Sequence, residues 1–366
     1  MEPQERSRIL KRGVLLSGVI LASIALAALA LSRSELGAEA VSDLLDRARL
    51  GPILASLLVM TSAMFLLGAR WRSLIPGGEK LPLFGLSTLT TTGLLLNVAL
   101  PGPAGELAVA VLVERRYGVP ATAALAGALS GRFVGLASAG VLAGLARLSG
   151  RLPVPEEYSG LVEIASLLIF AASGFLAFVA AKPQILSTIA TQSVGRLRGP
   201  RRIGQWMHKA HDAAQAMARD LSAVAALPWT RWLQASGWSM AGHLCVITGI
   251  GLGAWGMGVS FSIPGLVFTY SAATAGIVAL FLVPGGQLGW DAMFAAFLHV
   301  TAGVPKSDAV AVAVLVRVQQ TLLLLIGAAS FAAGGLGESK DPAGTPSGTP
   351  DPKARSESPS SGDSAP

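Results

Sequence analysis

Long apolar runs, separated by short polar or basic stretches, dominate this chain. A helix needs about 20 apolar residues to cross the hydrocarbon core of a bilayer. Six segments come close to or exceed that length: residues 13–32, 52–69, 121–146, 159–181, 230–256 and 308–335. The pattern therefore predicts about six full spans. The first of them also has features of a signal peptide, but its apolar run is longer than a usual signal core, which favours an uncleaved helix.

Two further apolar segments are broken near their middle. "LFGLSTLTTTGLLLNVALPGPAGELAVAVLVERRYG" is interrupted at 101–103, and "GLVFTYSAATAGIVALFLVPGGQLGWDAMFAAFLHVTAG" is interrupted at 284–286. The piece after each break has roughly 14 residues or fewer, too short for an untilted helix to cross a core of about 30 Å. Proline and glycine also interrupt backbone hydrogen bonds that lipid cannot replace. We expect two re-entrant helical hairpins, although two extra spans from each segment, giving ten helices, also fit.

A frame of charges surrounds a Gly-Val-Pro triplet that occurs twice, at 118–120 and at 303–305. An acid lies 14 residues before each proline, and an arginine lies 12 residues after it. The acids are Glu106 and Asp291, and the arginines are Arg132 and Arg317. Proline in the first turn of a helix has a structural reason, because its missing N–H would be unpaired there anyway. That reason does not explain the equal spacing of the charges.

The equal spacing predicts a duplicated unit, at about residues 83–146 and 264–335. With the N-terminus inside, the first hairpin enters from the cytoplasm and the second from outside. The two units would then be inverted copies. Inverted repeats with broken helices recur in secondary transporters, where the substrate site lies between the repeats. The predicted fold is therefore an all-α polytopic membrane protein with six spans and two re-entrant hairpins arranged as inverted repeats.

Composition supports a membrane protein. Hydrophobic residues make up 52% of the chain, charged residues 13%, and the mean hydropathy is +0.59. A soluble domain carries roughly a quarter charged residues. The net charge of +7 does not indicate nucleic-acid binding, because the basic residues flank the apolar runs.

The basic residues also predict the orientation. With the N-terminus inside, 20 of the 28 lysines and arginines lie in cytoplasmic segments and 6 lie outside, and the other two are Arg132 and Arg317. Arg70 is counted among the cytoplasmic ones. The positive-inside rule then places both termini in the cytoplasm of a multi-pass protein of the inner (plasma) membrane. The expected divisions are a cytoplasmic N-terminus (1–12), a transmembrane domain (13–335), a basic cytoplasmic connector with an amphipathic helix (183–229) and a disordered tail (336–366).

Arg132 and Arg317 are energetically unfavourable inside a membrane. A charge at the centre of a spanning helix costs about 2.5–3.5 kcal/mol, and both arginines lie some 18 Å into their helices at 1.5 Å per residue. In a functional interpretation, they hold an anionic group such as phosphate, while Glu106 and Asp291 orient them or exchange protons. In a structural interpretation, two buried ion pairs fix the hairpins. The sequence leaves both open.

Weaker candidates lie near the breaks. Asn97 and Gln287 can bond freed backbone groups or a headgroup, and Gln320 follows Arg317 closely enough to share its surroundings. His243 and His299 are isolated, which is typical of buried hydrogen-bonding groups. One cysteine allows no intrachain disulfide, and no metal, nucleotide or hydrolase motif is present. We expect no catalytic residue, no metal and no cofactor.

Three stretches together resemble a known family. They are "RWRSLIP", "NVALPGPAGELAVAVLVERRYGVPATAALAGALSGRF" and "VPGGQLGWDAMFAAFLHVTAGVPKSDAVAVAVLVR". They are similar to the flippase-like transmembrane family typified by the membrane domain of lysylphosphatidylglycerol synthases, over most of residues 12–335. The family's N-x-x-LP…GE frame looks like Asn97, Leu100-Pro101 and Gly105-Glu106, its PGGxG…acid frame like 284–286 and Asp291, and its two arginines like Arg132 and Arg317. Many members have an arginine where this chain has Val109 and an aspartate where it has Gly135.

The resemblance and the charges together predict a lipid or lipid-linked glycan flippase. Its substrate would be an anionic phospholipid or a polyprenyl-phosphate-linked lipid, with the headgroup in a central polar cavity. The synthase's soluble domain is absent, so aminoacylation by this chain alone is not expected. The alternatives are a secondary transporter of a small anion and a non-catalytic partner of a lipid- or glycan-modifying enzyme. A membrane glycosyltransferase is less favoured, because its acidic donor-binding motif is missing.

Overall fold

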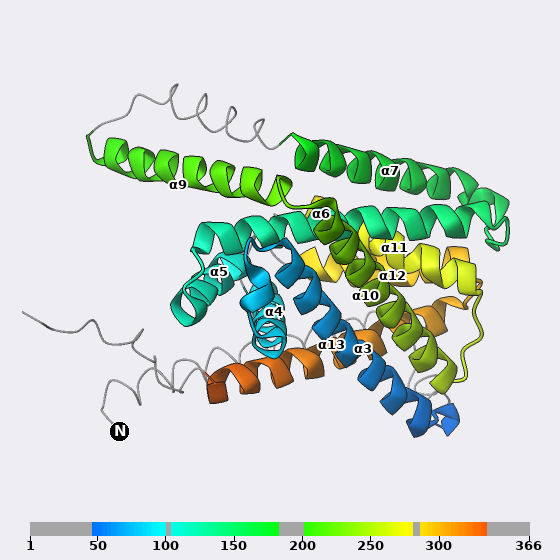
Figure 1. Cartoon of the computed structure of the whole chain (residues 1–366). Helices are drawn as coiled ribbons and strands as arrows, with labels where there is room; N and C mark the ends of the chain where they lie inside the picture. Colours follow the sequence, from blue (N-terminus) through cyan, green and yellow to red (C-terminus); the bar gives the residue numbers. More distant parts are fainter. Residues whose placement is uncertain (1–45, 100–103, 183–200, 281–285, 335–366) are drawn as a thin grey trace, which may run out of the picture.

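The computed structural model describes residues 46–99, 104–182, 201–280 and 286–334 (Figure 1). Every regular element in these ranges is helical. The helices are α3 (Leu50–Leu74), α4 (Leu83–Ala99), α5 (Ala104–Tyr117), α6 (Ala121–Leu148), α7 (Ser159–Ala181), α9 (Arg201–Ala225), α10 (Trp229–Gly256), α11 (Ile263–Leu280), α12 (Gly286–Ala302) and α13 (Lys306–Gly334), with 3₁₀ turns η1 (Gly78–Lys80) and η2 (Glu156–Tyr158).

Several predictions concern residues outside these ranges. They are the N-terminus with the first span, the tail, the break at 101–103, most of the break at 284–286 and the first part of the connector. The second part of the connector forms α9, the helix expected there.

Four of the described helices are long and apolar enough to cross a membrane: Leu50–Leu74, Ala121–Leu148, Glu156–Phe175 and Lys306–Leu325. They coincide with four of the six predicted spans, so the chain is an all-helical membrane protein over its described part. A fifth predicted span forms α10, whose 28 residues suffice in length. The pieces after the two breaks are short helices of 14 and 17 residues, α5 and α12. The total of six spans and the re-entrant path of the hairpins stay predictions.

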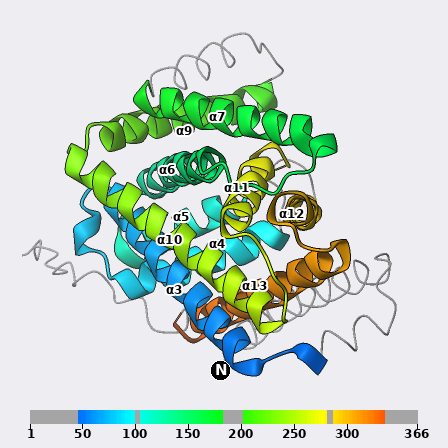
Figure 2. The same ribbon diagram turned by 90° about the vertical axis from the view of Figure 1, so that its right-hand side faces the viewer.

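An antiparallel pair, α3 and α10, runs diagonally across one face of the bundle (Figures 1 and 2). At one end, the Arg49 backbone N–H donates to the Gly256 carbonyl across 2.7 Å. At the other end, Arg231 at the start of α10 donates to Glu79 in η1 across 2.6 Å. Small residues allow this close packing: a Cβ on Gly249 would lie 2.5 Å from Met60 Cγ.

The two predicted units pack against each other beside this pair. The hairpin helix α4 packs against α13 of the second unit, and the hairpin helix α11 packs against α6 of the first. Figures 1 and 2 show α7 and α9 on one outer side of the bundle, and both contact α6. Each hairpin is therefore held by the long helix that follows the other hairpin.

The two Gly-Val-Pro triplets form the same turn. Gly118 and Gly303 both have φ of 70°, the left-handed conformation that glycine adopts without strain after a helix. Each glycine follows the short helix of its hairpin, and the next helix begins directly after Pro120 or Pro305. The spacing in the sequence thus corresponds to matching backbone geometry.

The two turns lie at opposite ends of α6. Pro120 immediately precedes the first residue of that helix. Gly303 instead lies against Pro153, just beyond the other end: Pro153 Cγ is 3.6 Å from where a Cβ on Gly303 would be. At 1.5 Å per residue, the 28 residues of α6 separate the turns by about 40 Å. The helices that follow the two turns therefore start from opposite ends of the bundle.

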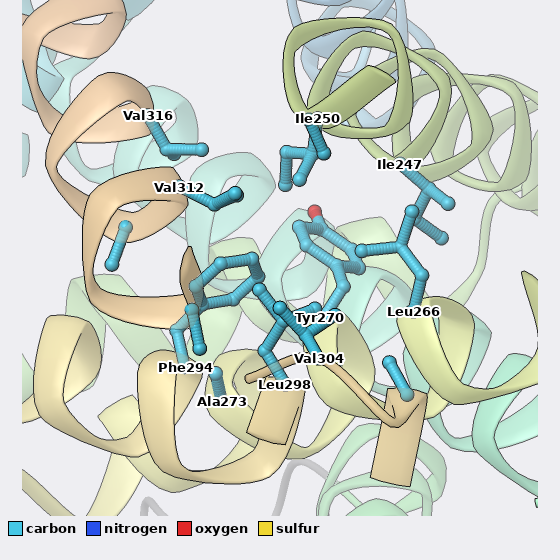
Figure 3. Close-up of a cluster of buried hydrophobic side chains, with 14 of the residues drawn as sticks. Ile247, Ile250, Leu266, Tyr270, Ala273, Phe294, Leu298, Val304, Val312 and Val316 are labelled. Carbon is cyan, nitrogen blue, oxygen red and sulfur yellow. The ribbon is translucent and has the colours of Figure 1, made fainter. Parts of the chain in front are cut away.

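A large apolar cluster joins α10, α11, α12 and α13 (Figure 3). Trp290 and Phe294 of α12 stack with ring centroids 4.9 Å apart, and Phe294 faces Val312 of α13. Tyr270 is fully enclosed by this cluster apart from its hydroxyl, which points from α11 toward α10. That hydroxyl marks the edge of a polar region inside the bundle.

Candidate functional site

The first repeated charge pair forms within the first unit. Arg132 on α6 contacts Glu106 on α5, with both Nε and Nη2 donating to Oε1. The arginine side chain is 34% exposed and the glutamate side chain 14%. The other carboxylate oxygen of Glu106, Oε2, is buried without a hydrogen-bond partner. The acid thus neutralises Arg132 with one oxygen and keeps the second one unused.

The second pair has the same arrangement in the second unit. Arg317 on α13 donates from Nε to Oδ2 of Asp291 across 2.9 Å and from Nη2 to Oδ1 across 2.7 Å. In this bidentate contact the arginine is more enclosed than Arg132, at 11% exposed, whereas the acid is somewhat more exposed than Glu106, at 22%. In both units the partners are 26 residues apart. Pairing within each unit offsets the cost of burying the charges, and a role in substrate binding stays a prediction.

Asn97 lies where the two legs of the first hairpin meet. A Cβ on Gly105 would come 2.3 Å from Asn97 Oδ1 and 2.7 Å from its backbone nitrogen, so α4 and α5 touch here only because residue 105 is glycine. Asn97 Oδ1 is buried and accepts no hydrogen bond. Glu106 follows Gly105 directly, so two unused acceptors come from neighbouring parts of the hairpin.

Two glutamines follow Arg317 on α13. Gln319 is buried, and its amide exchanges hydrogen bonds with the Ser56 hydroxyl at 3.0 and 3.2 Å. It therefore ties α13 to α3. Gln320 is only partly buried beside it. Gln287 lies in the first turn of α12, and its side chain lies outside the described residues.

Arg70 is a third arginine inside the bundle, although the count of basic residues grouped it with the residues that flank the spans. Helix α3 continues to Leu74, and Arg70 Nε is buried without an acceptor. Its Nη1 donates to Ser239 on α10 across 3.3 Å. Helical periodicity is the signal that could have found it, because Arg70 shares a helix face with the buried residues Ser56 and Ala63.

Two glycines of α6 form the surface under the Arg70 guanidinium. A Cβ at Gly131 would lie 3.4 Å from Nε, and a Cβ at Gly135 would lie 2.7 Å from Nη1. Arg132 follows Gly131 directly on the same helix. Arg70 therefore packs against the segment of α6 that carries the first ion pair.

His243 completes the polar region. Its Nε2 lies 2.8 Å from the Gly135 carbonyl, and its Nδ1 lies 2.9 Å from the Tyr270 hydroxyl. Because a carbonyl only accepts, Nε2 carries the proton in the neutral ring, and the hydroxyl donates to Nδ1. Both ring nitrogens are thereby used. His299 also bonds a backbone carbonyl, that of Val304, at 2.8 Å, but it is exposed, so only His243 is a buried hydrogen-bonding group.

Each repeated pair joins one acid to one arginine, whereas Arg70 forms no ion pair with a carboxylate among the described residues. Across the described ranges, no group of three or more His, Cys, Asp or Glu side chains is placed to hold a metal ion. The charged groups that the described region brings together are guanidinium groups and carboxylates.

Comparison with known protein families gives a match over most of the chain. The model of the family described as "Lysylphosphatidylglycerol synthase TM region" matches residues 15–327. The match includes the first unit, most of the second unit, both ion pairs and Arg70. No curated protein and no solved structure matches the chain significantly.

Proposed function

Because the chain belongs to the lysylphosphatidylglycerol synthase TM region family, we propose that it moves a lipid with an anionic headgroup between the leaflets of the inner membrane. The observation that carries the proposal is the matched pair of enclosed acid–arginine contacts, one in each unit at the same 26-residue spacing. An ion pair that only stabilises the fold would have no reason to recur at the same position of the second unit. Two copies on long helices that start from opposite ends suit a site that is reached from both leaflets.

We infer that the two units form an inverted repeat with re-entrant hairpins. The placement of the two glycine turns at opposite ends of α6 supports this, and so do the short lengths of α5 and α12. With the N- and C-termini in the cytoplasm, the first turn lies on the cytoplasmic side and the second on the outer side. Each hairpin then brings its acid to the middle of the bundle from one side.

In the proposed mechanism, the headgroup phosphate competes with the acids for the arginines. A guanidinium fork fits carboxylate and phosphate equally well in geometry. Glu106 and Asp291 neutralise Arg132 and Arg317 in the empty protein and release them when a phosphate arrives. The acyl chains stay in lipid throughout. The substrate is an anionic phospholipid or a polyprenyl-phosphate-linked lipid, and the chain performs no covalent chemistry, although it can serve a lipid- or glycan-modifying enzyme.

The test measures lipid movement in proteoliposomes that contain a fluorescent phosphatidylglycerol. A quencher that reaches only the outer leaflet reports the fraction of this lipid that lies there. The informative variant is the double substitution Asp291→Asn/Arg317→Gln. Removing both partners leaves no uncompensated charge, so the protein stays folded. We expect its lipid movement to fall at least about tenfold, the loss of one charge-assisted contact.

The matched control is Arg147→Gln/Glu163→Gln, which makes the same chemical change at an exposed pair 3.9 Å apart. It should move lipid at the wild-type rate. If the Asp291/Arg317 double variant is folded and moves lipid as fast as the control, the pair is structural and the proposal fails.

A further inference from the structure

A cluster of charges lies apart from the repeated ion pairs, where the turn after α3 meets the start of α10. It consists of Arg72 near the end of α3, Glu79 and Lys80 in η1, and Arg231 in the first turn of α10. We propose that this cluster binds the headgroup of an anionic phospholipid of the surrounding leaflet. The lipid would stay bound at the protein surface, so the inference does not depend on lipid movement past the acid–arginine pairs.

Hydrogen bonds hold the charged side chains around one short turn. Arg72 donates from Nε to the Gly78 carbonyl across 3.2 Å and from Nη2 to the Glu79 carbonyl. Arg231 donates from Nη2 to Glu79 Oε2 across 2.6 Å. A hydrogen bond from the Glu79 backbone N–H, then Arg231 and finally Lys80 lower the pKa of the Glu79 carboxyl. The Lys80 ammonium therefore also lies near this carboxylate.

The cluster has an excess of positive charge. Three basic side chains surround one carboxylate, so the ionised groups sum to +2. Among the described residues, Arg72 and Lys80 form no ion pair with a carboxylate, since Arg72 donates only to backbone carbonyls in its two hydrogen bonds with η1. Lys80 is exposed, and the side chains of Arg231 and Glu79 are 28% and 50% exposed. An anion can therefore reach the cluster from outside the bundle.

The residues next to the cluster place it at the membrane surface. Trp229, the first residue of α10, is 72% exposed, and tryptophan is enriched at the headgroup level of membranes. On α3, the exposed residues Leu58 and Phe65 precede Arg72 by fourteen and seven positions, which puts all three on one helix face. Phe84 of α4 is also exposed, with its ring centroid 6.1 Å from that of Phe65. The surface thus changes from charged to apolar within about two helical turns.

This arrangement fits a phospholipid better than an acidic segment of a soluble protein. A phospholipid brings its phosphate to the cations while its acyl chains cover the exposed apolar residues beside them. An acidic protein segment would use the charges alone. In the bound state, the phosphate accepts hydrogen bonds from Lys80 and competes with Glu79 for Arg231. The lipid would thereby stabilise the turn that joins α3 to the first hairpin.

The experiment measures quenching of tryptophan fluorescence by lipids with brominated acyl chains, using the full chain in bilayer vesicles. The contribution of Trp229 is the difference between a protein and its Trp229→Phe variant. Each uncompensated basic residue near a membrane surface favours an anionic lipid about fivefold. With a charge of +2, phosphatidylglycerol should therefore be preferred over phosphatidylcholine about 30-fold at Trp229. Equal quenching by the two brominated lipids would overturn the inference.

The informative variant is Lys80→Gln/Arg231→Gln, which lowers the charge of the cluster to zero. It should fold normally, because the pair that it breaks is exposed, and its preference for phosphatidylglycerol should disappear. The charge-matched control is Arg115→Gln/Arg116→Gln, which removes two exposed basic residues from the last turn of α5. This control should keep a preference of at least about 10-fold. An equal loss in both variants would mean that diffuse positive charge attracts the lipid, and it would reject a defined site.

A further variant, Glu79→Gln, changes the preference in the opposite direction. It removes the carboxylate that competes for Arg231, so the preference for phosphatidylglycerol should rise about fivefold. Glu114→Gln, which neutralises an exposed acid of α5, should leave it unchanged. An equal rise in both variants, or no rise with Glu79→Gln, contradicts the inference.

The source of the anion is tested with glycerophosphoglycerol, the headgroup of phosphatidylglycerol without its chains. At the concentration of the lipid, it should leave the quenching of Trp229 unchanged, because it lacks the apolar contacts. Displacement of the brominated lipid by this compound would assign the cluster to a soluble anion and overturn the assignment to lipid. Lipid movement is measured separately, so a failure of the proposed function and a failure of this inference are distinguishable.

Discussion

Gly265 near the start of α11 gives the sharpest test of the packing. A Cβ there would lie 2.0 Å from the Thr301 carbonyl oxygen and 2.4 Å from Ala302 Cα, both backbone atoms of α12. Real Cβ atoms essentially never come within 3.0 Å of another heavy atom. The substitution Gly265→Ala therefore forces α11 and α12 apart by about 1 Å, because backbone cannot rotate away as a side chain can.

The loss of stability can be estimated from the contacts that break when the two helices move apart. Overpacking of this kind costs about 1–3 kcal/mol. The Thr301 hydroxyl also bonds the Gly265 carbonyl at 3.2 Å and the Thr269 hydroxyl at 2.9 Å, and losing them costs about 1 kcal/mol each. Alanine regains up to about 1 kcal/mol of helix propensity over glycine. The free energy of unfolding should thus fall by about 2–4 kcal/mol.

Thermal unfolding of the detergent-purified chain measures this effect. The control is Gly237→Ala in α10, where nothing lies within 4 Å of the added Cβ. That change should leave stability unchanged or raise it by up to about 1 kcal/mol. Equal stability of Gly265→Ala and wild type would refute the packing of α11 on α12, as would an equal loss in both variants.

Two further predictions concern polar contacts. Tyr270→Phe removes the donor to His243 Nδ1 and leaves this buried acceptor unpaired. The free energy of unfolding, measured by chemical denaturation, should fall by about 1–3 kcal/mol. Adding His243→Phe removes the unpaired acceptor and should restore part of the lost stability. Outside the membrane, a hydrogen bond from its own backbone N–H and then Arg231 lower the pKa of Glu79 below its ordinary 4.5. Stabilisation from Glu79 is therefore present above pH 4.5 and lost as the pH falls through the lower folded pKa, so wild type and Glu79→Gln should differ in unfolding temperature at neutral pH and converge in acid.

The repeated frame was predictable because its physics is local. A left-handed glycine followed by proline fixes where one helix ends and the next begins. Once both helices start at defined residues, equal spacing puts the acid and the arginine at the same height in each unit. The contacts of Arg132 with Glu106 and of Arg317 with Asp291 follow from that register. Helix periodicity and Gly-Pro punctuation sufficed for this part of the site.

The remaining site residues depend on contacts between distant segments. Arg70 meets Ser239 across 169 residues, and His243 meets the Gly135 carbonyl across 108. Contacts between residues this far apart produce no regular spacing of residues within a single segment of the sequence. Arg70 also lies four residues before the end of α3. At the end of an apolar run, the positive-inside rule already accounts for a basic residue, so the charge itself gives no separate sign that this one faces the bundle.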